Sequence, residues 1–584
     1  MPEENLVKKN NRKRKKSFLK NARKYAKKGH FGRGSQMDED TYQFFLRSLE
    51  TFNLGFEDEE SKSHFVENVF EHTENQEIEC SSNQVGCRVI ETFLPFANDS
   101  ILRRFMEKFS EDLRPLVTDR FASFVLQELV QIACIKSIDP NINPDQQTYF
   151  KKFALKISKF LLNNLEDYMW DNTGNMVIRG CLRSLTQLPK ETTQKRTFNK
   201  VHEQFEGPYL EEYIEIVKDY GERLILWPQF NEMCFSDLTS GLFQILLQAL
   251  KQVDVKLLKK YLKKLLDDIF YSNEEQDSNK LPQAFMSSSA LMLLEVAVQV
   301  CGKKMFNLYC DQLFSNRILT LATMKSTSFL VQKIIGKCSN KTQFDPLFDE
   351  MSDHLWEVIE KGHPTIALAL CQACKRLSTK QGLFIQFLMK SFNCHEPEER
   401  QKDFPLSLSR LKPYKPNETT STENLAKERL SLEGTLMLQT MLEFNKPIKI
   451  VNALLTMDTN DLKNLFSNSM GSHITDSFVK SGFVGEKSRE KLVRKLMGTY
   501  QELAISRYGS RSFEAIWNVA NFKAKISIME ELAHKEGSWS NTEFGRIIAA
   551  KLNLVLFKRN KENWKIDLNK SKHKPEEILA EVLK

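Results

Sequence analysis

The chain has 584 residues, of which 41% are hydrophobic, and a formal net charge of +8. This apolar content is ample for a folded core, whereas no apolar run is long enough to span a bilayer, so no membrane partner is expected. The polybasic N-terminus lacks the apolar region of a secretory signal, and the odd number of eleven scattered cysteines indicates a reducing compartment.

The positive charge is concentrated at the N-terminus. Residues 1–36 hold thirteen Lys and Arg residues against Glu3 and Glu4, so this segment carries +11 and the remainder about −3. Its few apolar residues predict a disordered basic arm. The run Arg12, Lys13, Arg14, Lys15 and Lys16 indicates a nuclear localisation signal; RNA contact and a purely solubilising role stay open for the arm.

The first predicted helix runs from Asp38 to Phe52, with Asp38 or Asp40 as its cap and a stripe of core aromatic residues. A five-residue unit follows at Cys87–Glu91: a small residue, a side chain able to stack, two aliphatic residues and a polar residue. On a helix, positions one and five share a face, position two lies beside them, and positions three and four point into a core. Such a face can hydrogen-bond a base edge and stack on the base.

This unit recurs along the chain. Its position one falls at Cys87, Ser123, Asn175, Ser240, Leu291, Ser328, Thr365, Thr435, Ser472, Ser510 and Gly545. Six of the ten spacings lie between 35 and 38 residues, and the patterning is helical, which predicts an all-α fold, a curved α-solenoid of about eleven repeats. The matches at Leu291, Thr365 and Gly545 are weak, and the Thr365 unit is expected to be structural.

The candidate RNA-binding residues occupy positions one, two and five. They are Cys87, Arg88, Glu91, Ser123, Phe124, Gln127, Asn175, Met176, Arg179, Ser240, Gln244, Ser328, Phe329, Gln332, Thr435, Gln439, Ser472, His473, Asp476, Ser510, Arg511, Glu514 and Arg546. Two units depart from the pattern. Arg179 replaces an acceptor at position five, which favours a phosphate contact as much as a base contact, and Gly241 stands where a stacking side chain is expected.

Several segments are similar to those of a known family. "NQVGCRVIE", "DRFASFVLQ", "NTGNMVIRG" and "RYGSRSFEA" resemble the second-helix signatures of Pumilio (PUF) repeats. The opening "GHFGRGSQMDEDTYQFF" and the late "GSHITD", "YGSRSFEAIW" and "FGRII" resemble more narrowly the nucleolar Pumilio-like family of small-subunit ribosome biogenesis, over about residues 29–556.

The resemblance implies a non-catalytic RNA-binding protein of the nucleus and nucleolus. It would bind pre-rRNA, single-stranded and structured, near the 3′ end of the 18S sequence and restrain premature endonucleolytic cleavage. Proteins of the pre-ribosomal particle would be its other partners, and the chain would be a monomer. In the PUF code, the units at Ser123, Ser240 and Ser328 would favour adenine and the unit at Ser510 guanine.

The predicted domain organisation is a repeat solenoid over residues 37–556 and a charged tail over 557–584. Insertions are expected near 186–232 and 391–424. The first insertion should hold an extra helix at 207–222 and a turn at 226–230. The second, which contains four prolines, is expected to be a loop or disordered.

No residue pattern proposes catalysis or a cofactor. The chain has no phosphate-binding glycine loop, and the CxxC of Cys371 and Cys374, with Cys394 and His395 nearby, lacks a second well-placed pair for zinc, so no metal is expected. An RNA-processing enzyme would need an acidic metal cluster. The alternative to RNA binding is a protein–protein adaptor of importin or HEAT type, with the same periodicity but without the polar pairs at positions one and five.

Overall fold

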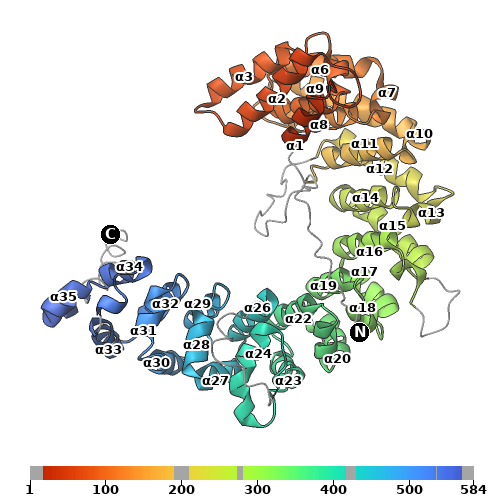
Figure 1. Cartoon of the computed structure of the whole chain (residues 1–584). Helices are drawn as coiled ribbons and strands as arrows, with labels where there is room; N and C mark the ends of the chain where they lie inside the picture. The colour runs from red at the N-terminus through yellow and green to blue at the C-terminus, as the bar shows by residue number, and fades with distance from the viewer. Residues whose placement is uncertain (1–17, 190–208, 272–280, 416–428, 535, 569–584) are drawn as a thin grey trace, which may run out of the picture. The chain divides into compact units, whose positions relative to one another are not determined.

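A computed structural model describes residues 18–189, 209–271, 281–415, 429–534 and 536–568. The chain divides into two compact units, Met1–Phe306 and Asn307–Lys584, and the division falls within α17 (Lys303–Tyr309). Throughout the described ranges the regular elements are helices (Figure 1), and the only β pairing there is an isolated bridge between Gly34 and Asn83.

Each predicted unit lies in the first turns of one helix, and we call these eleven helices the row helices. In the first unit they are α5 (Gln84–Phe93), α8 (Ala122–Lys136), α11 (Asn172–Leu185), α14 (Ser240–Val253) and α16 (Ser288–Val300). In the second they are α19 (Ser328–Lys337), α22 (Pro364–Leu377), α26 (Leu432–Leu442), α29 (Ser472–Lys480), α32 (Gly509–Val519) and α34 (Glu543–Lys551). Within each unit, every row helix packs against the next.

Two further elements precede each row helix. A longer helix comes first: α3 (Glu59–Glu71), α6 (Asp99–Glu111), α9 (Pro144–Asn163), α12 (Glu211–Ile225), α15 (Val255–Leu265), α17, α20 (Lys341–Ser352), α23 (Gln381–Ser391), α27 (Ile448–Thr456), α30 (Glu486–Lys495) and α33 (Phe522–Ala533). In Figure 1, α26, α29 and α32 lie side by side along one edge of the second unit, and α27, α30 and α33 along the opposite edge.

A short element joins the longer helix to the row helix. These elements are α4 (Glu77–Ser81), α7 (Leu113–Thr118), α10 (Leu165–Met169), α13 (Phe230–Phe235), η2 and η3 (Leu266–Phe270 and Gln283–Phe285), α18 (Ile318–Thr323), α21 (Leu355–Glu360), α24 (Phe404–Arg410), α28 (Thr459–Phe466), α31 (Tyr500–Ile505) and η6 (Glu536–Ser538). The predicted all-α repeat solenoid is thereby confirmed.

The aliphatic pair of each unit explains why the pattern folds in this register. Val89 and Ile90 of α5 are fully buried, as are Leu330 and Val331 of α19. Burying one such side chain contributes about 1.5–3 kcal/mol. Because positions three and four face the core, positions two and five must face outward.

Each row helix begins in close contact with the short element before it. At Gly471, just before position one of α29, an added Cβ would lie 1.9 Å from the carbonyl oxygen of Leu465. In two other repeats a threonine occupies the same place: Thr239 and Thr327 donate their hydroxyls to the carbonyls of Met233 and Leu321, at 2.7 and 2.5 Å. In these three repeats, the residue before position one is therefore either very small or hydrogen-bonded to this carbonyl.

We expect Gly471→Ala to lower the free energy of unfolding by about 1–3 kcal/mol, because the methyl group must displace backbone. Gly482→Ala is the matched control, since nothing lies within 4 Å of the Cβ that it would add. Urea unfolding followed by circular dichroism measures both. Equal stabilities of the two variants would contradict the close approach at Gly471.

The register of two weak units differs from the prediction by one residue. In α22 the buried pair is Ile366 and Ala367, so position one is Pro364, and Thr365 is at position two. At α34, Gly545 packs against the carbonyl of Trp539 as Gly471 packs against Leu465, so Gly545 precedes position one. Arg546 is therefore at position one, and the exposed Ile547 is at position two.

Both predicted insertions are smaller than expected. The predicted extra helix is α12, which packs on α9 and α14 as the regular first helix of the fourth repeat, and the predicted turn at 226–230 precedes α13. Within 391–424, α24 buries Phe404 and Leu408 and packs on α26, so it is the short helix of the eighth repeat. Residues 190–208 and 416–428 lie outside the described ranges.

The predicted disorder of residues 1–36 is wrong for residues 18–36. Helix α1 (Phe18–Ala26) packs on α2 (Glu39–Leu54), and Arg23 forms an ion pair with Glu50. The buried Asn83 donates hydrogen bonds of 2.9 Å to the carbonyls of Phe31 and Ser35 and also caps α5. Hydrogen bonds from the Asn83 side chain thus hold a segment whose composition is that of a disordered arm. The predicted localisation signal, Arg12 to Lys16, lies outside the described residues.

Specific hydrogen bonds anchor the start of α2 and the segment that follows the last row helix. Asp38 caps α2, as predicted, by accepting a hydrogen bond from Thr41 N at 2.8 Å. In the tail, α35 (Leu554–Arg559) buries Phe557, and the indole of Trp564 donates to Leu552 O at 2.8 Å.

The eleven cysteines all lie in described ranges, where each is a buried thiol. In those ranges no helix combines the length and apolar character needed to cross a bilayer.

Candidate nucleic-acid interface

Position two carries the most exposed side chain of the strong units. Phe124 of α8 is 39% exposed and Phe329 of α19 is 53% exposed, although phenylalanine is usually buried. Arg88, Met176, His473 and Arg511 are exposed at the same place in their helices, and Met292 is exposed in the weak unit of α16. The row helices therefore present flat or long apolar surface to solvent at regular intervals. Gly241 is buried instead, and Thr365 and Leu436 are half-buried at the same position.

The side chains at position one do not lie on the exposed surface as predicted. Its side chains are buried at Cys87, Ser123, Asn175, Ser240, Ser328, Thr435 and Ser472, and half-buried at Ser510. The hydroxyls of Ser328, Thr435, Ser472 and Ser510 donate to the carbonyl three residues earlier, and the Asn175 amide donates to Met169 O at 2.8 Å. A side chain of one or two carbons is too short to clear the packed helices, so these donors are engaged within the fold.

Position five is half-buried and shapes the surface between repeats. The amides of Gln127 and Gln332 donate to the carbonyls of Ser123 and Ser328, at 3.3 and 3.1 Å. Gln127 also lies over Gly180 of the next row helix, where an added Cβ would meet its Oε1 at 2.4 Å. Gln244 and Gln439 are half-buried at the same position.

Arg179 takes the place of the missing stacking residue in the fourth unit. Its guanidinium covers Gly241, where an added Cβ would lie 2.9 Å from Nη1. Within the described residues, the Nε of Arg179 is buried without a hydrogen-bond partner. A planar guanidinium can bind a phosphate or stack on a base.

A groove of about 490 Å³ lies on the row-helix surface of the first unit. It is lined by positions two and five of three successive repeats: Glu91 from α5, Phe124 and Gln127 from α8, and Met176 and Arg179 from α11. The structure therefore brings five of the predicted residues together from three helices. Apolar surface for stacking and polar groups for hydrogen bonds meet in one concave site.

Ion pairs link the corresponding positions in the second unit. Arg511 of α32 binds Asp476 of α29 at 3.0 Å, and Glu514 pairs with Lys551 of α34 at 2.9 Å. His473 lies 3.9 Å from the same Asp476. In the first unit, Arg88 pairs with Glu91 at 3.0 Å. Since these pairs are partly exposed, their contribution to stability is small, and an RNA phosphate could compete for the cations.

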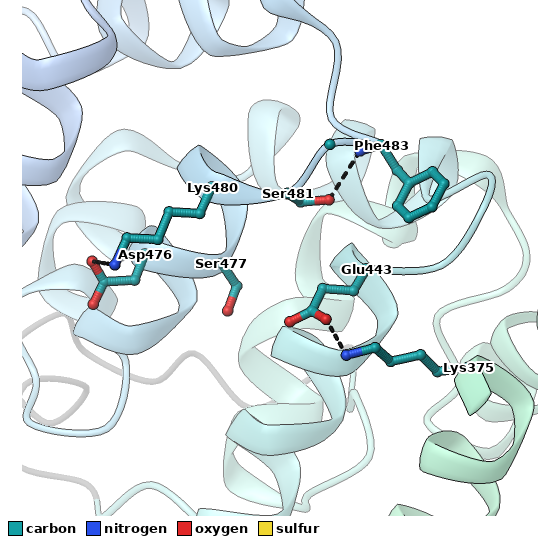
Figure 2. A pocket seen from close by; sticks show the side chains of 8 residues that line it. Lys375, Glu443, Asp476, Ser477, Lys480, Ser481 and Phe483 are labelled. Atoms are coloured by element: carbon teal, nitrogen blue, oxygen red, sulfur yellow. Dashed lines mark hydrogen bonds and ion pairs between the residues drawn. The ribbon is translucent and has the colours of Figure 1, made fainter. Parts of the chain in front are cut away.

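Figure 2 shows a second pocket, of about 330 Å³, on the second unit. Lys375 of α22 is paired with Glu443 at the end of α26, and Lys480 lies 3.7 Å from Asp476. The exposed ring of Phe483 follows α29 on the same side of the pocket as Ser481. Paired opposite charges therefore line this pocket.

The sequence analysis did not identify a further position of the row helices, position nine, which lies four residues after position five. One turn after position five, row helices carry a polar residue at Gln131, Arg183, Gln248, Gln299, Gln372, Glu443, Lys480 and Asn518, and each of these is half-buried or exposed. Gln131 and Arg183 line the groove of the first unit. Extending the five-residue unit by four residues would have revealed these positions, because residues four apart share a helix face.

Burial sets the chemistry of Cys87. It raises the pKa of this thiol to about 12, and the protonated sulfur donates to Phe121 O at 3.1 Å. Burial also raises the pKa of Cys80 and Cys338 to about 12. These thiols are neutral at physiological pH and are poor nucleophiles.

Because the pKa of the Cys87 thiol is higher in the folded state than its ordinary value of 9.0, its contribution to stability is complete below about pH 9 and is lost as the pH rises toward 12. We expect the free energy of unfolding to fall between about pH 9 and pH 10.5, by up to about 1.4 kcal/mol per pH unit for each titrating thiol. Urea unfolding at several pH values measures this loss. Cys87→Ala should show a shallower pH dependence than wild type, and identical slopes would contradict the assignment.

No metal site emerges in the described ranges, where no group of three His, Cys, Asp or Glu side chains could hold an ion. Cys371 and Cys374 are buried in α22, and burial raises the pKa of both.

Comparison with known proteins decides the family. The model of the NOP9-like PUF repeat domain matches residues 75–547, most of the chain. The chain belongs to the NOP9-like PUF repeat family. The predicted family and its nucleolar location are thereby confirmed. Since PUF repeats read RNA with two or three side chains per helical repeat, RNA is the class of ligand.

Relatives that are matched over most of their own length support this result. Human Nucleolar protein 9 is 23% identical over 559 residues, covering 89% of this chain and 87% of the relative. Pumilio homolog 23 of Arabidopsis thaliana is 19% identical, covering 91% and 73%. The solved APUM23-GGAAUUGACGG structure has 18% identity and a TM-score of 0.67 over 91% of this chain and 99% of that chain, so the fold is shared.

Proposed function

We propose that this protein binds pre-ribosomal RNA along its row helices and acts in ribosome biogenesis without catalysing a reaction. Single-stranded RNA would place successive bases against the position-two side chains, with positions five and nine beside the base edges. The observation that carries the proposal is the groove in which Phe124, Gln127, Met176 and Arg179 converge from neighbouring repeats.

The likeness to Nucleolar protein 9 relatives supports a more specific role. The RNA would be the pre-rRNA near the 3′ end of the 18S sequence, and the bound protein would restrain premature endonucleolytic cleavage there. Protection of this kind requires occupancy of the RNA and no catalytic group.

A filter-binding assay with the full chain tests the first step. Overlapping single-stranded and structured fragments across the 3′ end of 18S pre-rRNA are compared with scrambled RNA of equal length. We expect one single-stranded fragment to bind at least tenfold more tightly than its scrambled version. Equal affinity for all fragments and their scrambled versions would contradict the proposed sequence specificity.

A cleavage assay tests the second step. Labelled pre-rRNA is incubated with the protein and Mg²⁺ or Mn²⁺, and then with the processing endonuclease. We expect no cleavage by the protein alone and slower cleavage by the endonuclease in its presence. Unchanged endonuclease cleavage at saturating protein would refute the protective role while leaving RNA binding intact.

A further inference from the structure

A pocket of about 400 Å³ lies between α1 and the start of α5, the first row helix. Phe18, Tyr25 and Tyr42 supply rings to its lining, and His30, Arg33 and Gln84 supply polar groups. Volumes of about 300–1,000 Å³ with apolar walls and a few polar groups are typical of small-ligand sites.

Backbone contacts hold the pocket in shape. Gln84 N donates to Arg33 O at 2.8 Å, and His30 N donates to Tyr25 O at 3.1 Å. Gly32 and Gly34 have positive φ angles of 96° and 93°, and Gly32 lies directly against the Asn83 side chain. Since these contacts are already made in the protein alone, a ligand would meet a preformed site, at little cost in ordering.

The exposure of its rings distinguishes this pocket from core. Tyr42 is 1% exposed at the base, whereas Phe18 and Tyr25 are 38% and 48% exposed. Two half-exposed rings beside a cavity offer a stacking surface, and stacking tolerates any base because every base has a π face.

The charge around the pocket favours a polyanion. Residues 18–36 carry six Lys and Arg residues and no Asp or Glu. Arg23 is paired with Glu50, but Arg33 is exposed and makes no ion pair within the described residues. A phosphate group next to a stacked base would lie in a field of positive charge.

The pocket is continuous with the row-helix surface. Gln84 lines the pocket at the start of α5, and Arg88 is at position two of the first unit on the same helix. Because the two residues are four apart, they share one face of α5. An RNA strand lying on the first row helix therefore reaches the pocket without leaving that face.

We propose that this pocket binds one nucleobase of the RNA beyond the repeats, stacked on Tyr25 and Phe18, with Arg33 at its phosphate. The proposal rests on the proposed RNA-binding function. It assigns base contact to a segment that belongs to no repeat. It also gives the folded part of the N-terminal segment a role distinct from long-range attraction.

A double-mutant cycle tests the pocket, with the tightest single-stranded fragment of the filter assay as probe. The RNA is made intact and in versions that each lack one base but keep the ribose and phosphate. Tyr25→Ala should weaken binding of the intact RNA roughly tenfold. At one position near an end of the RNA, the abasic version should bind wild type and Tyr25→Ala equally.

Three variants complete the experiment. Tyr25→Phe keeps the ring and should bind as wild type, whereas Phe18→Ala should resemble Tyr25→Ala. Lys24→Ala, on the same helix but outside the pocket, should weaken binding of all versions of the RNA alike. If Tyr25→Ala costs the same on every version, or nothing, while Phe124→Ala weakens binding, the pocket proposal is wrong and the proposed function stands.

Discussion

Replacing both Phe124 and Gln127 with alanine is expected to weaken RNA binding by about 1–3 kcal/mol for each base that no longer stacks. Phe124 supplies the exposed ring in the groove, and Gln127 supplies the amide beside it and covers Gly180. Because Phe124 is exposed and Gln127 half-buried, the core of α8 should survive the change. Filter binding and circular dichroism measure affinity and helicity together.

The pair Phe329 and Gln332 allows the same test in the second unit and should weaken binding by a similar amount. Thr365→Ala is the control, since Thr365 occupies position two of α22 but is too short to stack on a base. Its affinity should equal that of wild type. Unchanged affinity of the double variants at unchanged helicity would refute the assignment of the row-helix surface.

Deletion of residues 1–17 is expected to lower affinity for all RNAs together. This segment holds seven Lys and Arg residues against two Glu residues. Each phosphate of a single strand that is no longer neutralised flattens the plot of log affinity against log salt by about 0.7. The ratio between cognate and scrambled RNA should stay nearly constant, because charge positions a strand whereas base contacts select it.

The deletion should stop at residue 17 because α1 and the carbonyls that Asn83 binds belong to the folded first unit. Loss of Arg12 to Lys16 should also reduce nuclear accumulation. A titration of both RNAs at several salt concentrations separates the outcomes. A collapse of the specificity ratio at an unchanged salt slope would mean that the arm, and not the repeats, selects the sequence.

The repeat architecture could be predicted because the residues of each five-residue unit determine which face of its helix is buried. Two adjacent aliphatic residues, such as Val89 and Ile90, must both be buried, and this fixes which face of the helix remains exposed. The register is ambiguous where more aliphatic residues follow. In α22, the buried pair of the unit could be Ile366 and Ala367 or Ala367 and Leu368, two registers one residue apart. Only the packing in the structure distinguishes them.

The remaining differences between the structure and the predictions arise from features that the pattern of apolar residues does not reveal. Residues 18–36 fold because Asn83 and backbone groups hydrogen-bond them, although their composition is basic and polar. Position one is buried because its side chains are short and the helices pack closely. The covering of Gly241 by Arg179 depends on two residues that are 62 positions apart in the sequence.

The most direct test of the central claim is a map of RNA crosslinks on the full chain. A single-stranded pre-rRNA fragment containing 5-iodouridine would be crosslinked by ultraviolet light, and the modified residues identified by mass spectrometry. The account predicts crosslinks at positions two, five and nine of the row helices, foremost Phe124 and Phe329. Crosslinks confined to the longer helices, such as α9, α15 or α30, would contradict it.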